Sequence, residues 1–182
     1  MHTEEELIKG CQKGDRKLQK ELYERFSGRM YALCLRYTKS TQEAEDVLQE
    51  AFIKVFDKIK DFKGDSTVGY WIKRIVINTA LNSQRGKLYL FPMVDVNDTD
   101  LKEREMNLSS IHLQDLLDLV QSLPAGCQAV FNLYAIEGYK HHEIAEMLEI
   151  SEGTSKSQYA RARQLLREML EKNENVRYEK FS

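Results

Sequence analysis

Apolar residues recur along most of this chain with the 3.6-residue period of an amphipathic helix rather than the two-residue period of a strand. The clearest example is the segment 42–60, where the apolar residues form one unbroken stripe. The members of this stripe are Ala44, Val47, Leu48, Ala51, Phe52, Val55, Phe56 and Ile59. Ser40 and Glu43 have the spacing of a capping box, which indicates where this helix begins.

Similar patterns predict helices before and after this one. Thr3 and Glu6 form a capping box for a first helix, which is expected to stop near Gly14. A second helix, with apolar residues at helical spacing, is expected to bend or break near Gly28. The sequence KGDST is interpreted as a loop that caps the next helix, 68–85.

The helical pattern fades over residues 87–110, where acidic residues outnumber basic ones, and this predicts a flexible acidic linker. A second helical block begins near Ile111. Within it, Pro124 suits the first turn of a helix and Gly138 suits a helix end. We therefore expect an all-α fold with two small helical domains. These domains are 1–88 and 111–182, joined by the linker 89–110.

Composition narrows the classes of protein that this chain could be. A net charge of −2 argues against a protein that coats nucleic acid non-specifically, but it permits local basic patches. Three cysteines without CxxC spacing indicate reduced, buried thiols rather than disulfides or a zinc site. No apolar run approaches the roughly 20 residues that cross a bilayer, and the N-terminus lacks an apolar signal core. We expect a cytoplasmic protein without membrane insertion.

Two adjacent histidines, His141 and His142, precede Glu143 and raise the question of a metal site. Adjacent helix positions point about 100° apart, so the two rings cannot bind one ion from a regular helix. The zinc-protease motif needs two histidines four residues apart. No cofactor or metal is expected, and the chain has no nucleophile triad or phosphate loop typical of a hydrolase. We interpret both histidines as solvated residues at a helix start.

The same stretch fits a helix-turn-helix. Ile144 and Leu148 would face inward from the first helix, Ile150 would fill the junction, and Ser151 would cap the second helix. In such a motif the second helix enters the major groove with its N-terminal end. The side chains there that suit phosphates and base edges are Thr154, Lys156, Ser157, Gln158, Arg161 and Arg163. Taken alone, the segment also fits an ordinary solvated amphipathic helix.

The outer face of the helix 42–60 carries acidic residues and, between Thr41 and Ala51, no basic residue. Ile53 lies outside the apolar stripe, beside Gln49 and Glu50. An acidic face with an exposed apolar residue is typical of a docking surface for a basic or mixed partner. A simple solvated face is the alternative.

The helix 68–85 has the opposite character. Its second stripe consists of Trp71, Arg74, Asn78, Asn82 and Arg85. These residue types bind nucleic acid and stack on exposed bases. Residues 54–87 contain eight basic and three acidic residues, so a local charge of +5 is hidden in the near-neutral total. Trp71 could equally belong to the core.

Three stretches stand in order along the chain: EAEDVLQEAFIKVF, FKGDSTVGYWIKRIVINTALN and LPAGCQAVFNLYAIEGYKHHEIAEMLEISEGTSKSQYARARQLL. Together they resemble the two conserved domains of bacterial extracytoplasmic-function (ECF) sigma factors of the sigma-70 superfamily, over residues 15–170. Each motif alone is moderately specific, whereas the ordered set is highly specific. The resemblance implies a protein that binds core RNA polymerase, directs it to specific promoters and helps to melt them, with no enzyme activity.

The resemblance also implies roles for individual residues. The first domain would bind the clamp helices of the largest polymerase subunit through a D-x-x-Q-E-x-F motif, in which Phe52 lies in the core stripe. The surface residues for this contact are Asp46, Gln49, Glu50 and the neighbouring Ile53. A loop and the helix after it would recognise the −10 promoter element and capture a flipped base. The residues for this role are Lys63, Asp65, Ser66, Trp71, Arg74, Asn78, Asn82 and Arg85.

In the second domain, the resemblance implies that Thr154, Lys156, Ser157, Gln158, Arg161 and Arg163 contact the −35 element. The polymerase flap is a further expected partner, and the linker would thread toward the active-site cleft. Family members are commonly held by an anti-sigma factor, and we expect one here.

Several positions depart from the family pattern, and among them Gln158 and Ala160 replace bulkier or basic residues of the recognition helix, so the −35 sequence cannot be carried over. Glu149 stands where the turn usually has glycine, Ser155 replaces a common valine, and Lys140 replaces the usual Ser or Thr cap. We expect the turn to be harder to form and the packing at Ser155 to be weaker. The alternative function is a stand-alone helix-turn-helix regulator, which would form dimers on palindromic sites. That alternative gives no reason for the acidic face or the basic stripe.

Overall fold

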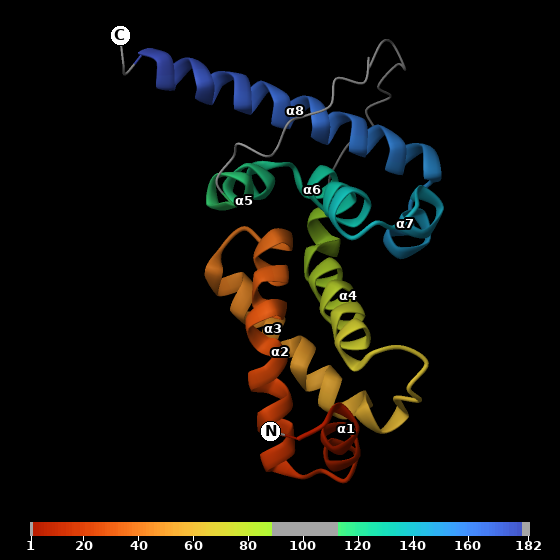
Figure 1. Ribbon diagram of the computed structural model, residues 1–182. Coiled ribbons are helices and arrows are strands. Elements are labelled where there is room, and N and C mark those ends of the chain that lie inside the picture. Colours follow the sequence, from red (N-terminus) through yellow and green to blue (C-terminus); the bar gives the residue numbers. More distant parts are fainter. Residues whose placement is uncertain (1, 89–112, 180–182) are drawn as a thin grey trace. The chain divides into compact units, whose positions relative to one another are not determined.

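The computed structural model describes residues 2–88 and 113–179, in which the secondary structure is helical throughout (Figure 1). The chain divides into two compact units, Met1–Gln84 and Arg85–Ser182. The expected fold class, two small all-α domains, is confirmed. The predicted linker, 89–110, and the predicted helix start at Ile111 lie outside the described residues, so the linker stays a prediction.

The first unit is built from four helices, drawn from red to green in Figure 1. They are α1 (Glu4–Gln12), α2 (Arg16–Tyr37), α3 (Thr41–Lys58) and α4 (Val68–Leu88), with a short 3-10 turn, η1 (Ile59–Asp61), after α3. The apolar stripe predicted for α3 is buried, apart from Phe56, which is half-buried. This stripe packs against α2, and the inner face of α4, which includes Ile72 and Val76, completes the core.

Helix starts follow the capping residues. Thr3 and Glu6 form the predicted capping box, and Gly14, at φ 79°, follows the end of α1. The Ser40 hydroxyl accepts from the Glu43 amide, as predicted. The Glu43 carboxylate, however, accepts from the amide of Lys39 instead of closing a box with Ser40.

Helix α2 runs without a break through Gly28, so the break predicted there is wrong, while a bend there stays a prediction. A single glycine costs a helix only about 1 kcal/mol relative to alanine. Burial of Leu22 and Met30 on either side outweighs that cost.

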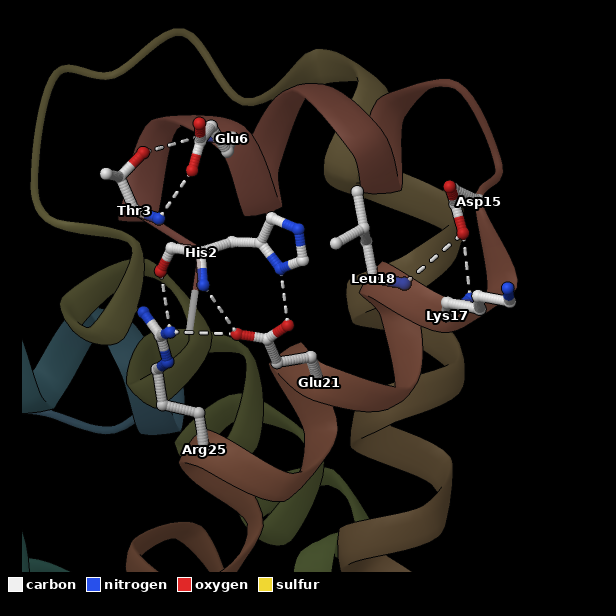
Figure 2. Close-up of polar contacts among 8 residues, drawn as sticks. All are labelled: His2, Thr3, Glu6, Asp15, Lys17, Leu18, Glu21 and Arg25. Atoms are coloured by element: carbon white, nitrogen blue, oxygen red, sulfur yellow. Dashed lines mark hydrogen bonds and ion pairs between the residues drawn. The ribbon is translucent and has the colours of Figure 1, made fainter.

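The start of the chain is tied to α2 by a polar cluster (Figure 2). The Glu21 carboxylate accepts from the backbone amide of His2 at 3.0 Å and lies 2.6 Å from its Nδ1. The Arg25 guanidinium donates to the His2 carbonyl at 2.8 Å and to Glu21 at 3.2 Å. The bonds from His2 lower the pKa of the Glu21 carboxyl. The cluster fixes where the chain enters α1.

The second unit holds α5 (Leu113–Ser122), α6 (Ala125–Phe131), the short π-helical segment η3 (Asn132–Ile136), α7 (His141–Leu148) and α8 (Glu152–Glu179). Its core lies where α5 and α6 pack on α8. The buried members are Leu119, Val120, Leu123, Cys127, Phe131, Ala162 and Leu166. Pro124 is the N-cap of α6, and Gly138, at φ 80°, ends the segment before α7.

Candidate protein- and nucleic-acid-binding surfaces

The outer face of α3 is exposed, and we call Asp46, Gln49, Glu50 and Ile53 the acidic face. All four side chains are exposed, and Ile53 is 62% exposed. Asp57, which the sequence did not suggest for this surface, is also exposed and lies four residues after Ile53 on the same side of the helix. Its position in the same i, i+4 register could have revealed it.

A lysine borders this face without neutralising all of it. The Lys54 ammonium lies 2.6 Å from the Glu50 carboxylate and 3.4 Å from the hydroxyl of Thr79 on α4. Asp46 and Asp57 have no ion-pair partner among the residues that the structure describes. An exposed isoleucine flanked by carboxylates therefore remains available to a partner.

The basic stripe of α4 is exposed as predicted. Arg74, Asn78, Asn82 and Arg85 all lie on the open side of the helix. Trp71 is neither fully buried in the core nor fully exposed. It is half-buried, and the centre of its ring lies 5.2 Å from that of Phe62. The stripe therefore presents cations and amides beside a supported aromatic ring.

The loop between η1 and α4 carries the three other residues predicted for the −10 element. Lys63, Asp65 and Ser66 are all exposed. Gly64 has φ 82°, which a residue with a side chain adopts only at a cost. The Thr67 hydroxyl accepts from the amide of Tyr70 and caps α4, as the sequence predicted.

Helices α7 and α8 and the turn between them form the predicted helix-turn-helix. Ile144 is fully buried and Ile150 is half-buried at the junction. Ser151 caps α8 by accepting from the amide of Thr154 at 2.9 Å. Glu149 occupies the left-handed conformation, φ 57° and ψ 43°, that favours glycine. Lys140 caps α7 through its backbone amide, which donates to the Glu143 carboxylate at 2.7 Å.

The residues predicted to contact the −35 element differ in their surroundings. Lys156 is exposed and pairs with Glu152 at 2.8 Å. Thr154, Ser157, Arg161 and Arg163 are half-buried, and the Arg163 guanidinium lies 5.9 Å from the centre of the Tyr159 ring.

Gln158 faces α6 rather than solvent. Its Oε1 accepts from the Cys127 thiol at 3.0 Å, and a side chain at Gly126 would lie 3.4 Å from the same oxygen. Gln158 therefore has a packing role that its spacing on the helix did not reveal.

The interpretation of His141 as a solvated residue is wrong, whereas His142 is exposed as expected. The His141 ring stacks on Tyr134 with centres 4.3 Å apart, and its Nδ1 lies 2.9 Å from the hydroxyl of the buried Ser155. The expected weak packing at Ser155 is thus offset by a hydrogen bond. Burial, and then the nearby Lys156, lower the pKa of His141.

The three cysteines are free and buried, as predicted. Burial raises the pKa of the Cys11 thiol to about 11 and that of Cys34 to about 12.

No helix among residues 2–88 and 113–179 is long and apolar enough to cross a membrane. Over the same residues, no group of three or more His, Cys, Asp or Glu side chains could hold a metal ion.

Comparison with known proteins identifies both units. The family model for Sigma-70 region 2 matches residues 22–87, and that for Sigma-70 region 4 matches residues 113–166. The chain is 31% identical over 178 residues to the ECF RNA polymerase sigma-E factor of Haemophilus influenzae, covering 90% of this chain and 93% of that protein. The chain belongs to the sigma-70 family, as an ECF sigma factor. This ECF sigma factor is also 30% identical over 181 residues to the RNA polymerase sigma-H factor of Pseudomonas aeruginosa, covering 92% and 94% of the two chains.

Solved structures share the fold of this sigma factor. CnrH in complex with the cytosolic domain of CnrY superposes with a TM-score of 0.52 at 21% identity, covering 92% of this chain and 97% of that one. The sigma factor RpoE, in complex with the anti-sigma factor NepR from Bartonella quintana, superposes with a TM-score of 0.53 at 21% identity, covering 84% and 96%.

Proposed function

We propose that this ECF sigma factor binds core RNA polymerase in the cytoplasm, directs it to specific promoters and assists promoter melting, without enzyme activity of its own. The main support is that one chain carries a region 2 match and a region 4 match in the order of the family, over 22–87 and 113–166. The near-neutral charge suits this role, because polymerase supplies most of the electrostatic attraction to DNA.

The acidic face is the proposed docking surface for the clamp helices of the largest polymerase subunit. Ile53 offers apolar area that is 62% exposed, and Asp46 and Glu50 lie one helical turn apart beside it. Opposite charges across an interface speed association and exclude wrong partners, while a central apolar residue supplies affinity.

The loop 62–67 and the basic stripe of α4 form the proposed −10 surface. Arg74 would pair with phosphates, while the amides of Asn78 and Asn82 can donate to and accept from base edges. Extruding a base costs a few kcal/mol. Stacking of the extruded base on an aromatic ring stabilises it by about 1–3 kcal/mol. Trp71, supported by Phe62 at 5.2 Å, and the amides near it can offset the cost of melting.

The N-terminal turns of α8 are the proposed −35 surface, with the polymerase flap as a further contact of the second unit. Lys156 and Ser157 lie within the first two turns of the helix, where a recognition helix meets base edges.

An anti-sigma factor is a further proposed partner. Two solved structures of the same fold each hold that chain together with a second protein, which for the sigma factor RpoE is the anti-sigma factor NepR. In this chain, the exposed Ile53 gives such a partner apolar surface that the polymerase also needs. Binding of the two would then be mutually exclusive.

Size-exclusion chromatography with bacterial core polymerase that lacks a sigma factor tests the proposal. We expect the wild-type chain to co-elute with core and the Asp46→Ala/Glu50→Ala variant to elute separately. The matched control is Glu5→Ala/Glu24→Ala, which removes the same charge from exposed residues that pair with lysines one turn away on α1 and α2. Binding by neither wild type nor control, together with dimeric binding to palindromic DNA, would favour the stand-alone regulator instead.

A further inference from the structure

Helix α1 lies before the residues that the region 2 family model matches, yet it contacts both ends of the proposed −10 loop. The side-chain amide of Gln12 donates to the carbonyl of Ile59 at 3.2 Å and to the carbonyl of Phe62 at 3.4 Å. At the other end, the Glu4 carboxylate accepts from the amide of Val68 at 3.1 Å. The loop 62–67 is therefore held at both ends by one helix.

Two of these bonds, to the carbonyl of Phe62 and from the amide of Val68, satisfy backbone groups that lack a partner in regular structure. The carbonyl of Ile59 also accepts from the amide of Phe62. Val68 is the first residue of α4, and the first amides of a helix have no acceptor within it. A carboxylate at that position also interacts favourably with the helix dipole. The carbonyl of Phe62 lies where the chain leaves η1 and enters the loop, and Gln12 supplies a donor that this carbonyl needs. The bond from Gln12 to Ile59 reaches the first residue of η1.

Helix α1 is itself rigidly placed, so it can act as a fixed support. Leu7 and Cys11 are buried in the core of the first unit. Gly10 lies so close to α2 that a Cβ there would stand 2.0 Å from a methyl carbon of Leu18. The cluster of His2, Glu21 and Arg25 fixes the start of the helix (Figure 2).

We propose that Glu4 and Gln12 are positioning residues, which hold the loop 62–67 in the conformation that engages the displaced promoter strand. The inference rests on the proposed function of that loop. Neither residue touches DNA. They act through Phe62, whose ring supports Trp71 at 5.2 Å, and through Val68, where α4 and its basic stripe begin. A loop already held in its binding conformation loses less entropy when it captures DNA.

The fluorescence of Trp71 reports directly on how firmly α1 holds the loop 62–67, because Trp71 is the only tryptophan of the chain. We expect Glu4→Ala and Gln12→Met to increase acrylamide quenching of Trp71 fluorescence, since Phe62 and the start of α4 become mobile. Glu5→Ala is the matched control, because Glu5 is the next residue, also lies in the first turn of the helix, and pairs with Lys9. It should leave quenching unchanged. Equal quenching in all four proteins would overturn the proposal.

Transcription by reconstituted holoenzyme tests the consequence for function. On a duplex promoter, we expect the Glu4→Ala/Gln12→Met variant to form open complexes about fivefold more slowly than wild type, which corresponds to a barrier raised by about 1 kcal/mol in total. On a template already unpaired at the −10 element, the deficit should shrink, and binding to core should not change. Glu4→Gln, which keeps an acceptor oxygen, should restore most of the rate.

Trp71 quenching and holoenzyme transcription test two claims separately. The first tests whether α1 holds the loop 62–67, and the second tests the proposed function. If the variants change quenching but wild-type holoenzyme shows no promoter-dependent transcription, the proposed function fails while the support by α1 stands. If wild type is active, and the variants match it on the duplex promoter despite altered quenching, the positioning role is overturned.

Discussion

The Nδ1 atom of His141 lies 2.9 Å from the Oγ atom of Ser155, and this contact joins the first residue of α7 to the buried side of α8. The ring itself stacks face to face on Tyr134. Burial and the Lys156 ammonium disfavour protonation and lower the pKa of His141, while Glu152 acts in the opposite direction. The packing of the helix-turn-helix thus favours a neutral imidazole.

This contact predicts that acid weakens the helix-turn-helix. Because the folded protein binds the His141 proton less tightly than the unfolded chain, stability is lost as the pH falls through the unfolded pKa of about 6.5. We expect His141→Gln to show a smaller fall in melting temperature than wild type between pH 7.5 and pH 5.5. His142→Gln is the control, because His142 is exposed. Its melting temperature should fall by as much as that of wild type. Parallel falls in all three proteins would contradict the prediction.

Two helical glycines of the first unit should respond in opposite directions to alanine. A Cβ at Gly28 meets nothing within 4 Å, so Gly28→Ala should stabilise the protein by about 1 kcal/mol through helix propensity. A Cβ at Gly10 would collide with Leu18 at 2.0 Å, so Gly10→Ala should destabilise by about 1–3 kcal/mol. Urea unfolding monitored by circular dichroism measures both. A loss of stability in Gly28→Ala would show that α2 needs flexibility there.

Features set by neighbouring residues could be predicted from the sequence. The caps at Thr3 and Ser151 depend on bonds over three residues, and both are present. The stripe of α3 and the exposed residues of α4 follow from helical period alone. The break predicted at Gly28 is wrong because the low helix propensity of one glycine is a weak local effect. The burial of apolar residues along the whole helix outweighs it.

Contacts between distant segments could not be predicted in this way. Gln12 meets Phe62 across 50 residues, and Gln158 meets Cys127 across 31. Periodicity says which side of a helix is buried, but it does not say which neighbour fills that side. For the same reason the sequence does not reveal the surroundings of His141, since Tyr134 and Ser155 reach it only after the chain has folded back.

The turn of the helix-turn-helix carries backbone strain that can be removed. Glu149 is held at φ 57°, where a residue with a Cβ costs roughly 1–2 kcal/mol. Glu149→Gly should therefore stabilise the protein by about 1 kcal/mol. Glu149→Ala keeps the Cβ and should give no gain, which separates strain from the loss of the carboxylate. The midpoints of urea unfolding for the two variants provide the test. Equal midpoints would argue that the turn is not strained.

Lys156 and Gln158 lie two residues apart on α8 but should affect promoter binding in different ways. Lys156 is exposed, so Lys156→Ala should remove one phosphate contact and reduce by about 0.9 the slope of log affinity against log salt. Gln158 accepts from the buried Cys127 thiol, so Gln158→Ala should lower stability by about 1 kcal/mol and leave the salt slope unchanged.

Holoenzyme binding to a promoter duplex, measured from 50 to 200 mM salt, separates these outcomes when urea unfolding of the free chains is measured beside it. Gln164→Ala serves as the control, because Gln164 is exposed on α8 and donates to Glu168, one turn away. If Gln158→Ala instead changes which base is preferred within the −35 element while stability stays at the wild-type value, its side chain must leave Cys127 to contact DNA. The helix would then read DNA with a residue that the free protein keeps packed against α6.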